Sequence, residues 1–164
     1  MFELSRFFKN DYEHGRDFVA DLDKFFGNLP KGWPYAVEMR NSHWLAPDYF
    51  ACLSRHGIAH VFNSWDAMPP VSEQMSLPGS RTNPELVAAR FLLKPGRKYE
   101  DAVKTFQPYD KTKEVNDEAR KAGADLIKEG KAAGTKKKTL IFVNNRLEGN
   151  ALETINAMIE RVDA

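Results

Sequence analysis

The chain has 164 residues, of which 42% are hydrophobic and 29% charged, the balance of a folded globular protein rather than a disordered one. Its 24 Lys and Arg residues nearly cancel its 23 Asp and Glu residues, so net charge gives no argument for broad affinity for nucleic acids or membranes. The single cysteine, Cys52, excludes an internal disulfide and favours a reducing, cytoplasmic location. No apolar run is long enough to span a bilayer, and the N-terminus lacks the pattern of a signal peptide.

The first half of the chain alternates between helical and extended patterns. Apolar residues recur at helical spacing over residues 15–26, before a break rich in proline and glycine. A short strand is predicted over residues 35–39, and Pro47 begins a helix that ends near His56. Cys52 lies in an apolar stretch of this second helix, which predicts a buried, inert thiol. The next strand is predicted over residues 58–62.

The second half continues the alternation after a long polar segment. Residues 63–84 are rich in proline and polar side chains, so we predict a loop with at most one helical turn. A third strand over residues 86–93 is stopped by Lys94-Pro95-Gly96. The remaining predicted elements are a short helix over residues 99–106, a longer helix over residues 115–130, a fourth strand over residues 139–143 and a last helix over residues 151–162.

This order predicts a parallel sheet whose strands are joined by helical crossovers. The strands are short and largely apolar, as expected when both faces of a sheet are covered. A closed β/α barrel has eight strands and about 250 residues, and an open sheet of four would leave two edges unpaired. We therefore predict one domain over residues 1–164 with the α/β architecture of half a parallel, TIM-like barrel.

Charged residues inside two apolar strands mark a candidate site. Glu38 and Arg40 share one face of the first predicted strand, because side chains alternate along a strand. Arg90 lies within the third. Buried charges are costly unless they are paired, so Glu38 is either half of a structural ion pair with Arg40 or Arg90, or a general acid or base beside an anion-binding arginine. Both interpretations stay open. Lys94 at the end of the third strand supports the anion interpretation.

Polar residues follow the fourth strand. Adjacent Asn144 and Asn145 offer amide donors and acceptors, and we expect one of them to contact a ligand. Asn150, with Glu153 three residues later, predicts an N-terminal cap, and such a helix start also favours anions. The histidines show no spacing typical of a metal site, and no phosphate-binding glycine loop or catalytic triad motif is found. We therefore predict no metal ligands.

These segments resemble the YecE-like family, known as domain of unknown function 72. The similarity lies in Ala36-Val37-Glu38-Met39-Arg40 followed by Trp44, and in Asn144-Asn145 followed by Gly149, Asn150 and Ala151. The resemblance implies a β/α barrel of which this chain corresponds to the last four β/α units, and it adds Trp44 and Gly149 to the candidate substrate-binding residues. Leu92 departs from the family, where many members have a histidine.

The sequence favours binding or processing of an anionic or phosphate-bearing substrate, such as a nucleotide, at the carboxyl ends of the strands. Glu38 would be the acid or base, and Arg40 and Arg90 the charge clamp. Nucleic acid is an alternative that rests only on positive residues and fold analogy. Two other hypotheses remain: a binding or assembly module that pairs with a second copy or with a complementary N-terminal half, and a truncated, inactive half-barrel. Whether the chain is an enzyme stays open, and no cofactor is indicated.

Overall fold

A computed structural model describes residues 1–8 and 10–163 of the chain. Every predicted helix and strand is found, with bounds that differ from the prediction by at most three residues. The elements, in chain order, are β1 (Phe2–Glu3), α1 (Gly15–Gly27), β2 (Ala36–Glu38), the 3-10 helix η1 (Ser42–Trp44), α2 (Pro47–Arg55), β3 (Ala59–Ser64), α3 (Val71–Ser76), β4 (Leu86–Phe91), α4 (Tyr99–Phe106), α5 (Asp117–Ala133), the 3-10 helix η2 (Gly134–Lys136), β5 (Lys138–Val143) and α6 (Ala151–Asp163).

The strands form one parallel sheet in the order β1-β2-β3-β4-β5. The predicted number of four strands is wrong, because β1 adds a fifth beside β2. Only two residues long, β1 shows no alternating pattern and is defined by its pairing, in which Phe2 lies opposite Val37 and Glu3 opposite Glu38. A parallel α/β sheet is therefore confirmed. The sheet is open and does not close into a barrel.

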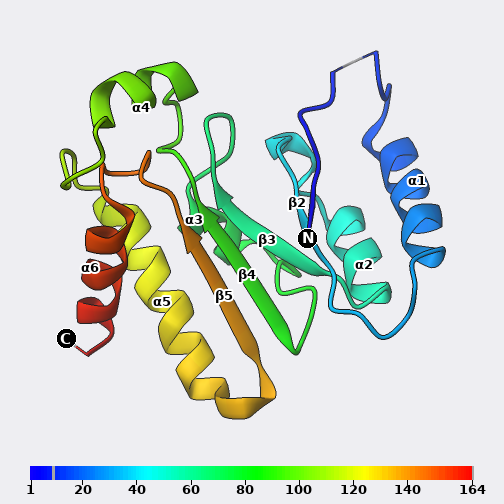
Figure 1. Cartoon of the computed structure of the whole chain (residues 1–164). Coiled ribbons are helices and arrows are strands. Elements are labelled where there is room, and N and C mark those ends of the chain that lie inside the picture. The colour runs from blue at the N-terminus through cyan, green and yellow to red at the C-terminus, as the bar shows by residue number, and fades with distance from the viewer. Residues whose placement is uncertain (9, 164) are drawn as a thin grey trace.

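Helices cover one face of this sheet (Figure 1). Strands that follow one another in sequential order through right-handed crossovers place their connecting helices on the same side. Val37 and Met39 of the β2 region pack with α1 and α2, whereas Phe62 of β3 and Val87 of β4 pack with α5 and α6. Burial of these two apolar clusters fixes which side of each strand faces the helices.

The opposite face of the sheet carries small apolar side chains. Ala36, Ala59, Val61 and Ala88 pack on one another there. In Figure 1 no helix lies in front of β4 and β5. Along β5 every second residue is exposed, including Phe142. The expectation that both faces of the strands would be covered is thus wrong for β5.

Two segments differ from the predictions for local reasons. Val115 lies before α5 and its side chain is exposed, because the helix begins after Asn116, whose side-chain oxygen accepts a hydrogen bond from the Ala119 N–H at 3.1 Å. Strand β3 continues to Ser64, two residues into the predicted loop over residues 63–84, and this loop contains the short helix α3. Gln74 of α3 is buried and donates to the backbone oxygen of Asn63 at 2.6 Å, which anchors this helix to β3.

Among the described residues, no helix is both long enough and apolar enough to pass through a bilayer.

Candidate anion site at the carboxyl ends of the strands

Glu38, the last residue of β2, is a fully buried carboxylate held by two arginines. Its Oε1 accepts a hydrogen bond from Arg40 Nε at 3.0 Å, and its Oε2 accepts one from Arg90 Nη1. Both partners considered from the sequence therefore bind it at once. A carboxylate with no exposed surface would be strongly destabilising without such compensation. The structure thus brings the three predicted catalytic residues into one cluster.

Glu3 completes this cluster from β1. Its Oε2 lies 2.9 Å from Arg40 Nη2 and 2.8 Å from Arg90 Nη1, so one carboxylate oxygen bridges two guanidinium groups. The side chain of Glu3 is 42% exposed, whereas those of Arg40 and Arg90 are 16% and 21% exposed. Sequence analysis missed Glu3 because its partner Arg90 is 87 residues away and its strand carries no pattern of its own.

Two residues around β3 support the arginines. The Arg40 guanidinium lies 4.0 Å from the centre of the Trp65 ring, a favourable cation–π contact. Asn63, opposite Arg90 in the sheet register, is fully buried and donates through Nδ2 to the Met39 carbonyl at 2.9 Å. In the part of the chain that the structure describes, Asn63 Oδ1 has no hydrogen-bond partner. An unpaired acceptor therefore lies on the strand beside the charge cluster.

The four charges of the cluster balance formally, with two carboxylates against two guanidinium groups. Partial burial disfavours the charge on Arg90, but hydrogen bonds and charges from Glu3 and Glu38 outweigh it and raise the pKa of Arg90 above its ordinary value. Arg90 is therefore a permanent cation. Each carboxylate of the cluster is thus already bonded to both arginines.

Trp44 and Lys94 lie apart from this cluster. Trp44 is buried against Phe18, with stacked rings 4.5 Å apart, and belongs to the core between η1 and α1. It also lines a hollow of about 610 Å³ together with Arg6 and His43. Lys94 is exposed after β4. No hydrogen bond or ion pair connects either residue to Glu38 within the described residues, and their binding roles stay predictions.

The turn between β5 and α6 uses its asparagines to hold itself together. Oδ1 of Asn144 accepts from the Arg146 N–H at 2.9 Å, and Oδ1 of Asn145 accepts from the Ala151 N–H at 2.8 Å. Asn150 Oδ1 accepts from the Glu153 N–H at 3.1 Å, which confirms the predicted cap. The reciprocal half of a capping box is not made, because the Glu153 carboxylate instead accepts from the Thr112 N–H at 2.7 Å.

Inside this turn lies a second buried carboxylate, Glu148, that sequence analysis missed. Arg120 of α5 binds it with Nε at 2.9 Å from Oε1 and Nη2 at 3.0 Å from Oε2. The hydroxyl of Thr154 on α6 donates to it at 2.7 Å, and the Asn116 N–H donates as well. These contacts all come from the protein itself and hold the turn against α5 and α6. The sequence offered one signal for this buried carboxylate: Glu148 lies between Leu147 and Gly149, in a turn that a helix follows.

The family assignment follows from a comparison with family models. Residues 4–164 match the model described as Protein of unknown function DUF72. The chain belongs to the DUF72 family. The resemblance inferred from the segments around Glu38 and Asn144 is confirmed. No curated protein gives a significant match to this DUF72 chain.

Solved structures show the same fold. A DUF72 family protein from Enterococcus faecalis V583 is 22% identical, with a TM-score of 0.58, and the match covers 91% of this chain and 54% of that one. A DUF72 family protein from Thermotoga maritima MSB8 is also 22% identical, with a TM-score of 0.58, and the match covers 91% of this chain and 53% of the other. This DUF72 chain thus spans just over half the length of these relatives.

Proposed function

We propose that Arg40 and Arg90 bind the phosphate or carboxylate group of a small molecule at the carboxyl ends of the strands. One observation carries the proposal: a single oxygen of the half-exposed Glu3 bridges both guanidinium groups. Planar guanidinium groups recognise phosphate and carboxylate oxygens in this manner. Glu3 therefore occupies the position that a ligand oxygen would take.

Buried Glu38 orients the two arginines in this proposal. Each of its oxygens is bonded to one guanidinium, so neither arginine rotates away when Glu3 is displaced. With no exposed surface, Glu38 fits a positioning role better than direct proton exchange with a substrate. Whether the site also performs a reaction depends on groups around the bound anion.

Neighbouring polar groups would define the rest of the ligand. Asn63 has no exposed surface, as Glu38 has none, so it would support the arginines from within the sheet and not contact the ligand. Lys94, which is exposed, would add a third positive charge beyond β4. The Nδ2 groups of Asn144 and Asn145 remain donors for a more distant part of the ligand. This arrangement favours a phosphate-bearing molecule such as a nucleotide over nucleic acid.

Calorimetric titration with inorganic phosphate and with a nucleoside monophosphate tests this site. Arg90→Ala removes a charge-assisted hydrogen bond worth about 1.5–3 kcal/mol, so the affinity should fall roughly tenfold or more. Glu3→Gln removes the competing carboxylate charge and should strengthen binding. Glu13→Gln, an exposed carboxylate outside the cluster, is the control and should change nothing. Equal affinities for wild type, Arg90→Ala and Glu3→Gln would refute the proposal.

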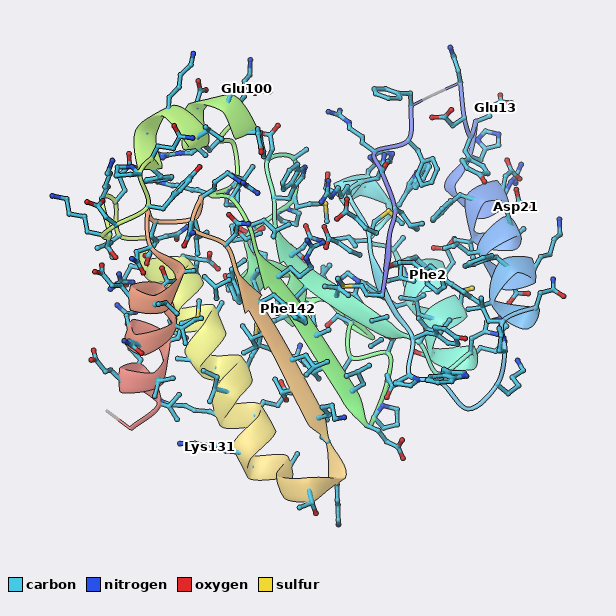
Figure 2. All side chains as sticks on the ribbon, in the orientation of Figure 1. Phe2, Glu13, Asp21, Glu100, Lys131 and Phe142 are labelled. Atoms are coloured by element: carbon cyan, nitrogen blue, oxygen red, sulfur yellow. The ribbon has the colours of Figure 1, made fainter. Side chains whose placement is uncertain are left out.

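A second candidate function is assembly of a complete β/α barrel. Leu140 and Phe142 of β5 are 40% and 51% exposed, although they lie on the sheet face that carries Ala88. Together with Trp33 they line a hollow of about 740 Å³ (Phe142 is labelled in Figure 2). Exposed apolar surface of this kind marks an interaction site. We propose this chain as the last β/α units of a family barrel.

The occupant we propose for this face is a second copy of the chain. A two-fold axis along the strands would place β5 of each copy beside β1 of the other, so that all strands stay parallel and both free edges are paired. Each open apolar face would then cover the other. The formal net charge of +1 per chain opposes this contact very little.

A further inference from the structure

Three metal-ligating side chains meet between α1 and α2, away from the arginine cluster. Asp23 comes from α1, Cys52 from α2, and His56 is the residue that caps the end of α2. One ligand atom of each lies within 4.8 Å of the other two. Cys52 and His56 are four residues apart, so a helix places them on the same side, facing Asp23. No other such trio is found in the described part of the chain.

The separations between these atoms are close to those that a metal ion requires. Asp23 Oδ1 lies 2.7 Å from His56 Nε2 and 3.9 Å from Cys52 Sγ. Metal–ligand distances of 2.0–2.3 Å around tetrahedral Zn²⁺ correspond to ligand–ligand separations of roughly 3.3–3.6 Å. Small side-chain rotations would lengthen the separation between Asp23 and His56 and shorten that between Asp23 and Cys52.

We propose that Asp23, Cys52 and His56 bind one Zn²⁺ ion and thereby join α1 to α2. A thiolate, an imidazole nitrogen and a carboxylate oxygen form a ligand set suited to zinc, with water as the fourth ligand. Each helix contributes at least one ligand, so binding stabilises the packing of α1 on α2. The ion would be structural, because this site lies apart from Glu38, Arg40 and Arg90.

The surroundings of the trio support this role. The Cys52 thiol is buried, and zinc would bind it as the thiolate with release of the proton. Phe26 packs edge-on to the His56 ring at 5.7 Å and shields one side of the site.

Arg55 is the competing cation. Its Nη2 lies 3.1 Å from Asp23 Oδ1, but its side chain is 62% exposed. An exposed ion pair contributes little stability, so Arg55 would move into solvent at small cost when the metal binds. The side chain of His56 is 17% exposed, which leaves a route for the ion from solvent.

Cobalt titration of the untagged, metal-free chain tests the proposal. Co²⁺ should bind one-to-one and give a thiolate-to-cobalt charge-transfer band in the near ultraviolet, with visible bands of a tetrahedral ion that Zn²⁺ abolishes. Zn²⁺ should raise the melting temperature. Cys52→Ser should lose the charge-transfer band, and Asp23→Asn and His56→Gln should weaken binding at least tenfold. Asp21→Asn, on the exposed side of α1 (labelled in Figure 2), is the matched control and should bind as wild type does.

Two outcomes would overturn the zinc site. The first is a cobalt complex without a charge-transfer band, or with a band that survives in Cys52→Ser. The second is an equal zinc-dependent rise in melting temperature in wild type, Asp23→Asn and His56→Gln, which would indicate binding to other surface groups. Circular dichroism of each variant distinguishes loss of metal from loss of folding, and Asp23 and His56 keep enough exposure for their substitution to leave the core intact.

Discussion

His60 is a single ionisable side chain enclosed in the apolar core of β3. Its ring lies edge-on to Phe62 at 5.1 Å and to Phe50 at 5.4 Å, and its Nδ1 is 3.4 Å from the Tyr49 hydroxyl. Burial lowers the pKa of His60 to about 3, far below the value of about 6.5 for an exposed histidine. The folded protein therefore holds this ring neutral.

This neutral ring makes the stability of the fold depend on pH. Below about pH 6.5 the unfolded chain binds a proton at His60 that the folded chain does not bind, so acid favours unfolding until pH falls to about 3. The contribution amounts to about 2 kcal/mol between pH 7 and pH 5. His60→Gln should remove it. Denaturant unfolding of wild type and variant at both pH values measures this, and equal losses in the two proteins would contradict the prediction.

The turn between β5 and α6 acts as one structural element through Glu148. The carboxylate binds Arg120 and Thr154, so it joins the starts of α5 and α6. Next to it, Gly149 has a φ of +118°, and a Cβ there would lie 2.4 Å from the Lys111 carbonyl oxygen. Only glycine fits this close approach. The backbone at Gly149 thus requires glycine for a structural reason, and a binding role for Gly149 stays a prediction.

Removal of Glu148 should unfold this element first. Glu148→Ala leaves the Arg120 guanidinium without its buried partner, which costs about 3–5 kcal/mol. Glu160→Ala, at an exposed position on α6, is the control and should change the free energy of unfolding by less than about 0.5 kcal/mol. Chemical denaturation measures both. A similar small effect for the two variants would show that Glu148 is not an anchor.

The success of sequence-based prediction for each element depended on how local its signal is. Helical periodicity over residues 15–26 lies within one segment, so α1 was found, whereas the two residues of β1 gain their structure only from β2. The same rule holds for the candidate site. A charge inside an apolar strand is visible in the sequence, which singled out Glu38 and Arg90. Glu3 has no local signal, because what matters is its contact with arginines distant in the sequence.

Long-range contacts also explain what was missed elsewhere. The pairing of Glu148 with Arg120 spans 28 residues, and Asp23 meets His56 across 33 residues. The spacing between histidines carries no signal for a metal site in this sequence, whereas Cys52 and His56 lie four residues apart at the end of α2. A cluster of side chains from two helices can be recognised only when the packing of those helices is known.

At the scale of the whole molecule, the open sheet underlies the proposal that the chain forms a dimer. Its helix-covered face is complete, but Leu140 and Phe142 expose apolar surface on the other face, and β1 and β5 each leave one edge unpaired. Parallel strands with a free edge and an apolar face are normally covered in stable proteins. A second copy of the chain would supply strands that pair with both free edges and an apolar face that covers Leu140 and Phe142.

Light scattering after gel filtration should therefore give a mass near 37.4 kDa, twice the 18.7 kDa of one chain. Phe142→Lys places a charge in the proposed contact and should produce monomers, because burial of an unpaired ammonium group costs more than the contact gains. Leu152→Lys on α6 is the matched control: Leu152 is 73% exposed but lies outside the hollow, so the dimer should persist. A wild-type monomer that is stably folded at high concentration would contradict the dimer. Dissociation by both substitutions alike would place the contact elsewhere, because Phe142 lies on the open face of the sheet and Leu152 lies on α6.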